Sequence, residues 1–115
     1  MAIFRINTAL AAAGVNPNLL NGSKFEFLHA PSVCTLWATD FGNAAASELT
    51  FTLGNVVVAE NIPVNTAGAL GVINTLSDRI GSGVGVASDR IQISARNTDA
   101  ALGTTISIQL EISEL

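Results

Sequence analysis

Charged side chains are scarce in this chain of 115 residues, where Asp, Glu, Lys and Arg together make up 12%. That is about half the share found in ordinary globular domains. The basic residues form no cluster along the sequence, and the formal net charge is −4. Because nucleic acids are bound through grouped Lys and Arg side chains, we expect no direct binding to nucleic acid. We interpret the shortage of charge as surface that other subunits cover.

Reactive and metal-binding groups are equally scarce. Cys34 is the only cysteine and His29 the only histidine, so an intrachain disulfide is excluded, and a zinc site would need Cys34, Asp or Glu at every other position. We expect Cys34 to be buried as a small apolar residue and His29, close to Pro31, to be structural. No nucleophile-elbow motif accompanies the histidine. The sequence thus predicts no catalytic residue, no metal ion and no cofactor.

Long hydrophobic runs are also missing. No stretch approaches the roughly 18 apolar residues of a membrane-spanning helix, and the Ala9–Ala13 segment is too short and too weakly apolar for a secretory signal. We therefore expect no membrane partner, with synthesis and folding in the cytoplasm. Apolar residues make up 49% of the chain, so its length suits one domain with a core that needs no metal or disulfide.

Residues 1–23 differ from the rest of the chain. Asn7 is suited to cap a short helix over Thr8–Ala13, which Gly14 would end. Turn-forming clusters then isolate Leu19 and Leu20. This N-terminal segment is expected either to pack on the domain or to project as an arm, and residues 24–115 are expected to form a single β-rich domain.

Apolar and polar residues alternate in several stretches, as they do in strands with one buried face. The run from Val33 to Phe41 is apolar on both faces, which predicts a central strand or one at an interface. A hairpin is predicted across Gly54-Asn55, with Leu53 facing Val56 and Phe51 facing Val58. The other predicted strands are Phe25–His29, Arg90–Arg96 and Thr104–Ile112.

The two C-terminal strands are expected to pair with each other in antiparallel fashion. In the register that matches their apolar faces, Ile93 lies opposite Ile108 and Arg90 lies opposite Glu111. Glu48, Glu60 and Glu111 are expected on the solvent-facing sides of strands.

Helical spacing replaces alternation after Pro63. Leu70, Ile73, Leu76 and Ile80 recur at intervals typical of a helix near residues 66–80, which Gly81 would end. Residues 81–86 then predict a flexible or tightly turning link into the strand Arg90–Arg96. Their glycines are unsuited to a phosphate loop because they follow the helix and have no Lys nearby. The sequence Ser77-Asp78-Arg79-Ile80 recurs as residues 88–91, which we interpret as chance because one copy falls on the helix and the other on a strand.

These elements predict an α+β fold that is mainly β: an antiparallel sheet or a small β-sandwich or barrel, with one helix near 66–80 and an N-terminal helical or arm-like segment. Phe27 and Phe51 are expected in the core. Trp37 is expected either there or at an interface.

The apolar, turn-rich stretch from Met1 to Ser23, the low charge, the absence of tyrosine and the short Thr/Val/Ile strands together resemble small bacteriophage head proteins of the cement or decoration kind. The resemblance implies a non-enzymatic β-rich body on the surface of a virion. Such a body contacts the major capsid protein and forms a homo-oligomer, with a trimer favoured. It carries over no site residues. The alternative is a carbohydrate-binding or adhesive β-module of a tail or fibre, in which Trp37 and nearby Asn and Asp side chains hold sugars.

Overall fold

The computed structural model of the protein describes residues 2–42, 47–66 and 72–115, and all of its regular elements are strands. The predicted α+β class is therefore wrong, and the fold is all-β. In chain order the strands are β1 (Ala2–Leu10), β2 (Val15–Asn16), β3 (Ser32–Gly42), β4 (Ser47–Leu53), β5 (Val56–Pro63), β6 (Asn65–Thr66), β7 (Arg79–Gly85), β8 (Ile91–Asn97) and β9 (Thr104–Glu114).

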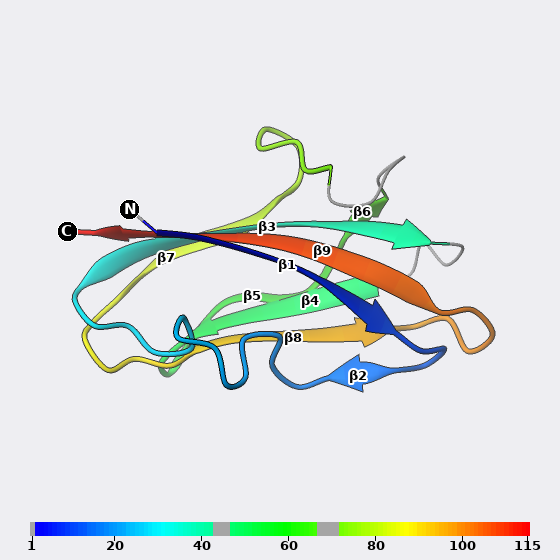
Figure 1. Cartoon of the computed structure of the whole chain (residues 1–115), viewed down its shortest axis with the longest axis horizontal. Coiled ribbons are helices and arrows are strands. Elements are labelled where there is room, and N and C mark those ends of the chain that lie inside the picture. The colour runs from blue at the N-terminus through cyan, green and yellow to red at the C-terminus, as the bar shows by residue number, and fades with distance from the viewer. Residues whose placement is uncertain (1, 43–46, 67–71) are drawn as a thin grey trace.

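The strands form two facing sheets (Figure 1). One has the order β1-β9-β3, with β7 and the short β6 both against β3, and the other has the order β2-β8-β4-β5. If the short β6 is set aside, the strands pair from the two ends of the chain inward: β1 with β9, β2 with β8, β3 with β7 and β4 with β5. All four pairs are antiparallel. This nested pairing, folded over into two sheets, is the topology of the jelly roll.

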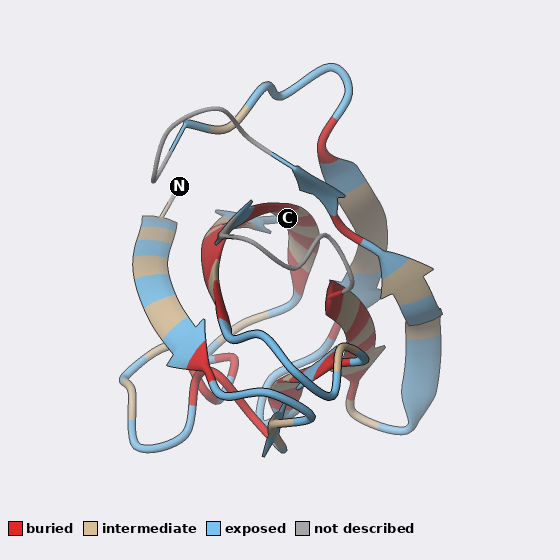
Figure 2. Ribbon diagram, turned by 90° about the vertical axis from the view of Figure 1, so that its right-hand side faces the viewer, coloured by how far each residue is buried: buried red, intermediate tan, exposed pale blue. Residues whose placement is uncertain are grey.

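The core fills the space between the sheets with alternate residues of the long strands (Figure 2). Cys34, Leu36 and Ala38 of β3 and Ile106, Ile108 and Leu110 of β9 point inward from one sheet, and Leu49, Phe51, Leu53, Ile91, Ile93 and Ala95 do so from the other. The predicted inward faces of β4, β8 and β9 are confirmed. The central position of β3 is also confirmed, because it is paired on both sides.

The predicted pairing of the two C-terminal strands is wrong. β9 lies between β1 and β3, whereas β8 lies between β2 and β4 in the opposite sheet. Arg90 pairs with Glu26 at 2.8 Å instead of with Glu111. The apolar alternation identified the buried faces correctly, but in a jelly roll these faces meet across the core.

The β4–β5 hairpin is confirmed at its turn and wrong further along. Leu53 pairs with Val56 and Thr52 with Val57, but the register then shifts, so Phe51 lies opposite Ala59 instead of Val58. The predicted strand Phe25–His29 is also wrong, because within it only Phe27 makes a bridge, to Arg90.

The predicted helix at 66–80 is wrong where the structure describes it, and residues 67–71, including Leu70, lie outside the described residues. Thr66 ends β6, residues 72–78 are irregular, and Arg79 begins β7. Asn74 N donates to Asp78 Oδ2 at 2.7 Å, and Asp78 N donates back to Asn74 O at 2.8 Å. Such local side-chain bonds compete with a helix, and Leu76 is 94% exposed, so the helical spacing marked no buried face.

The glycines predicted to form a flexible link lie in β7, a strand pressed against the second sheet. A Cβ on Gly83 would lie 2.9 Å from Val58 Cγ2, and one on Gly85 would lie 2.5 Å from Leu28 Cδ1. These residues are glycines because neighbouring side chains occupy the space that a Cβ would need.

Both copies of the Ser-Asp-Arg-Ile motif lie at a turn before a strand, although Ser88 has a positive φ of 74° and Ser77 does not. Each serine lies in a turn and each aspartate accepts a bond from the backbone N–H of a preceding residue, Asn74 for Asp78 and Val86 for Asp89. Strands β7 and β8 then begin at Arg79 and Ile91. The first copy therefore does not fall on a helix as predicted, and both copies lie where a turn precedes a strand.

The N-terminal segment is neither a helix nor an arm. Residues 2–10 form β1, which pairs with β9 along its whole length, and Leu19 and Leu20 are buried in the core. The asparagine expected to cap a helix, Asn7, instead lies within the strand on its exposed face.

Candidate functional site

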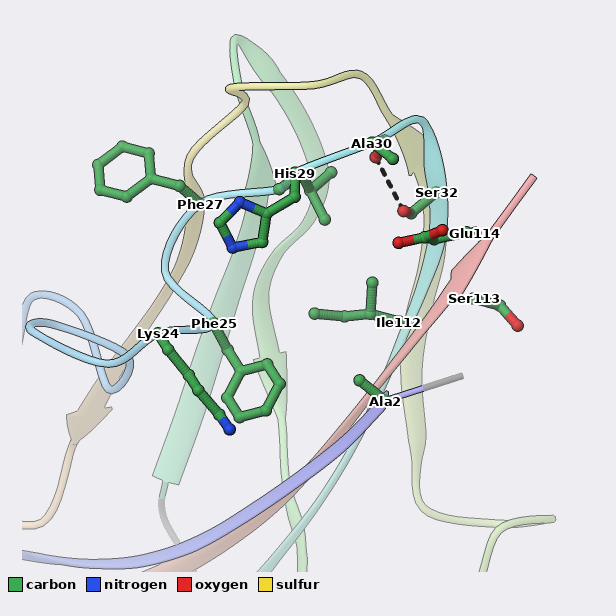
Figure 3. A pocket seen from close by; sticks show the side chains of 11 residues that line it. Ala2, Lys24, Phe25, Phe27, His29, Ala30, Ser32, Ile112, Ser113 and Glu114 are labelled. Atoms are coloured by element: carbon green, nitrogen blue, oxygen red, sulfur yellow. Dashed lines mark hydrogen bonds between the residues drawn. The ribbon is translucent and has the colours of Figure 1, made fainter.

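An open cavity of about 410 Å³ lies at one end of the sandwich, where the connection from β2 to β3 passes the ends of β1 and β9 (Figure 3). Residues 24, 25 and 27–30 of this connection line one wall, and Ala2 and residues 112–114 line the other. The volume suits a small ligand or an inserted side chain.

The walls of the cavity are mixed in character. Phe25, Leu28 and Ile112 supply apolar surface, and the Phe25 ring lies 5.1 Å from that of Phe4. Figure 3 shows the His29 ring and the Glu114 carboxylate reaching toward the space from opposite walls. The site therefore combines an apolar base with a few polar groups, as binding pockets do.

Glu26 fixes the wall formed by residues 24–30. Its carboxylate accepts bonds from Gly22 N at 3.0 Å and from Arg90 Nε at 2.8 Å. The Gly22 N–H, and after it the Arg90 guanidinium, lower the pKa of Glu26 below its ordinary value. Backbone bonds from Ile91 N to Glu26 O and from Leu28 N to Asp89 O attach the same segment to β8 and the turn before it.

Two candidate nucleophiles of β3, Ser32 and Cys34, are respectively hydrogen-bonded and buried. Ser32 Oγ donates to Ala30 O at 2.9 Å, so its hydroxyl is already engaged. Cys34 is fully buried as predicted, and burial raises its thiol pKa to about 11, which leaves almost no thiolate at neutral pH. Neither the Ser32 hydroxyl nor the Cys34 thiol is therefore an activated nucleophile for His29.

Trp37 lies away from the cavity, half-buried on the outer face of β3. Its Nε1 donates to Thr75 O at 2.9 Å and so ties residues 72–78 to the sheet. Of the two phenylalanines expected in the core, Phe51 is buried as predicted. Phe27 is 50% exposed and lies at the cavity, so its prediction is wrong. Glu60 is exposed as expected, while Glu48 is half-buried and bonded to Arg96 at 2.7 Å, and Glu111 is half-buried on the outer face.

Sequence reasoning missed a buried polar cluster at the other end of the sandwich. Asp40 Oδ2 accepts a bond from Ser47 Oγ at 2.7 Å, and Asp40 Oδ1 accepts one from Thr104 Oγ1. The signal was present, because Asp40 has the same parity as the inward-facing Leu36 and Ala38. Both carboxylate oxygens are satisfied by hydroxyls from neighbouring strands, so the cluster joins β3, β4 and β9.

Exposed apolar side chains are spread over the surface rather than gathered at the cavity. Those on or beside strands include Ile3, Val15, Val56, Val57, Val84 and Val86. Among the described residues, no group of three or more His, Cys, Asp or Glu side chains is placed to hold a metal ion. Nor does any helix of the described chain have the length and apolar character to cross a membrane.

No family model matches the sequence, and no curated protein matches it either.

Proposed function

We propose that this protein is a non-enzymatic viral structural protein that binds an assembled capsid shell on the virion surface and stabilises it by contacting major capsid subunits. Jelly rolls are common in viral capsids, but they also occur in lectins and cupins, so the topology alone does not assign a role. The observation that carries the proposal is the surface, where apolar side chains are exposed on several strands and charges are few.

Such a surface suits association with other protein subunits. The exposed valines of β5 and β7, together with Ile3 and Val15, belong to both sheets. Burying apolar area is favourable by about 25 cal/mol per Å², and an interface poor in charge avoids much of the cost of desolvation. We include in the proposal a homo-oligomer, for which the family resemblance favours a trimer.

A stabilisation assay tests this function. The purified protein is added to shells prepared without it, and the temperature at which the shells release their genome is measured. A cement protein raises that temperature and saturates at a fixed number of copies per shell. No shift at saturating concentration, or no binding at all, would refute the proposed role.

Surface variants then test the apolar contact. Val15→Lys, Val57→Lys and Val84→Lys each place a charge on an exposed apolar site, and Ala87→Lys places one on an exposed site without a large side chain. We expect at least one valine variant to weaken shell binding about tenfold, or about 1.4 kcal/mol, with Ala87→Lys unchanged. Equal binding by all four would show that apolar contacts do not hold the protein on the shell.

Carbohydrate binding is the second candidate, and the cavity is the observation that favours it. Trp37, first expected to hold sugars, is bonded to Thr75, whereas Phe25, Phe27 and His29 surround an open space. Aromatic rings beside hydrogen-bonding groups suit sugar rings. Glycan-array binding that is lost in Phe27→Ala, by a protein that leaves shells unchanged, would favour this candidate.

A further inference from the structure

Among the described strands, β1 lies at the end of its sheet with one side open for pairing. No strand pairs with that side of β1 in the part of the chain that the structure describes, and Figure 2 shows the strand beginning near the N-terminus at the margin of the molecule. Its nine residues pair with β9 without a register shift. The strand holds no Pro, Gly or Lys, and Arg5 is its only charged residue. Proteins usually interrupt exposed edges with such residues or with bulges.

The other outer strands show the interruptions that β1 lacks. β5 has two register shifts, ends in Pro63 and holds Asn61 at a φ of 49°. β7 contains three glycines and lies opposite a register shift in β3. β2 and β6 are two residues each. Among the described strands, β1 therefore offers the longest regular edge for pairing with another strand.

Hydrogen-bond parity shows which backbone groups β1 presents at this edge. Leu115 N donates to Pro31 O, and each of these residues lies one position beyond the paired residues Ser32 and Glu114. Ser32 and Glu114 are therefore a non-hydrogen-bonded pair, and hydrogen-bonded and non-hydrogen-bonded pairs alternate from there along β3 and β9. Ala38 N donates to Asp78 O on the other side of β3, as this parity requires. The backbone N–H and C=O groups of the even-numbered residues of β9 therefore bond to β1, where their register partners are also even-numbered. The N–H and C=O groups of Ile3, Arg5, Asn7 and Ala9 therefore face outward.

Inward-facing apolar groups along β1 also remain partly open. Phe4 and Ile6 pack against the core, yet each is only half-buried. On the facing sheet the outer strand, β2, spans only Val15–Asn16, which is too short to lie opposite most of β1. A strand added beside β1 would cover these side chains and satisfy the outward backbone groups at the same time.

We propose that β1 is a dimerisation edge, at which β1 of a second copy of this chain adds in antiparallel orientation about a two-fold axis through Ile6. An isologous contact of this kind closes on itself. It differs from the trimer that the family resemblance favours, and it does not depend on the proposed capsid role.

The register follows from parity, length and charge. Only registers that pair odd residues with odd ones bring the outward backbone groups together. An axis through Ile6 pairs all nine residues of the strand, placing Ala2 opposite Leu10 and Arg5 opposite Asn7 of the second copy. An axis through Arg5 would place two guanidinium groups opposite each other, which is unfavourable. An axis through Asn7 would leave Ala2 and Ile3 without a partner in the strand. The Ile6 axis is therefore the favoured one.

Disulfide trapping tests this register. Ile6 would face its own copy as a non-hydrogen-bonded pair with Cα atoms about 4.5 Å apart, within the range that a disulfide spans. Ile6→Cys should therefore form a covalent dimer under mild oxidation. In Thr8→Cys the two introduced thiols would lie four positions apart, about 13 Å, so this matched variant should stay monomeric on a non-reducing gel. Wild-type protein, whose Cys34 is buried, gives the background.

Sedimentation of edge variants provides the independent measurement. Arg5→Pro removes an outward N–H that β9 does not use, so we expect a folded protein in which the wild-type dimer is lost. Arg5→Ala keeps that N–H and should dimerise as the wild type does. The melting temperature of each variant shows that its fold is retained. A wild-type protein that stays monomeric at high micromolar concentration, equal trapping of both cysteine variants, or a dimer that survives Arg5→Pro would overturn the proposal.

Discussion

Burial determines what Cys34 contributes to this protein. The side chain points into the core from the central strand β3 and has no exposed surface. Burial raises the thiol pKa from 9.0 to about 11. In this pH interval the unfolded chain loses the thiol proton and the native protein keeps it, so stability falls as the pH rises. Below the unfolded-state pKa the thiol is protonated in both states and has no such effect.

The first prediction is that Cys34→Ser removes part of this alkaline loss of stability. The variant should be less stable near pH 7, because a hydroxyl replaces an apolar thiol in the core, but its stability should fall less steeply between pH 9 and pH 11. Denaturant unfolding of both proteins across that range measures the difference. Parallel pH profiles, or rapid labelling of native Cys34 by a thiol reagent, would contradict the assigned burial.

The second prediction concerns the glycines of β7. In Gly83→Ala the added Cβ meets Val58 and Leu53, at 2.9 and 3.1 Å, so we expect a loss of about 1–3 kcal/mol from overpacking. Ser82→Ala, at the neighbouring position that faces outward opposite Thr35, should cost less. The double variant Gly83→Ala/Val58→Ala should recover part of the loss. Denaturation midpoints that are the same for Gly83→Ala and Ser82→Ala would show that β7 does not pack as described.

At the scale of single strands, the alternation of apolar and polar residues predicted which face of a strand is buried, but it did not predict which strands pair. Ile106, Ile108 and Leu110 point inward as the pattern predicts, because period-two burial is a property of one strand and one core. Pairing depends on which strand the chain brings alongside, and β8 and β9 are placed in different sheets by the nested topology.

Two other sequence features, the glycines at residues 81–85 and the helical spacing after Pro63, led to wrong predictions of local structure. From the sequence alone the glycines of β7 suggested a flexible segment. In the structure the side chains of Val58 and Leu28 lie where a Cβ of these residues would be, so the glycines are required by packing. The spacing of Ile73, Leu76 and Ile80 matched a helix, but the carboxylate of Asp78 and the backbone of Asn74 form a turn instead. Both features depend on contacts that sequence periodicity does not encode.

The third prediction tests the inward face of β9. Ile108 is buried and Gln109 lies on the outer face, where Arg5 Nε donates to its Oε1 at 2.9 Å. Ile108→Asp should unfold the protein, because an unpaired carboxylate would lie in the core. Gln109→Asp should stay within about 0.5 kcal/mol of the wild type, as surface substitutions usually do. Circular dichroism and thermal unfolding of both variants measure this contrast, and a stable Ile108→Asp protein would be inconsistent with the fold.

At the scale of the whole molecule, the candidate site is built from segments far apart in the chain. The cavity joins residues 24–30 to the ends of β1 and β9, and the ion pair of Glu26 with Arg90 attaches its wall to the rest of the structure. Local sequence patterns predicted Trp37 as the aromatic anchor but gave no indication of this cavity, because its walls meet only after β1 and β9 have paired. The jelly-roll surface, low in charge and rich in exposed valine, remains the basis for the proposed structural role.

The most direct test of that role is quantitative mass spectrometry of virus particles purified from the source through a density gradient. A capsid-binding protein should sediment with the particles and appear at a constant ratio to the major capsid protein in every fraction and preparation. If the chain is absent from the particles, or is present only in traces whose ratio varies between preparations, the structural role is contradicted.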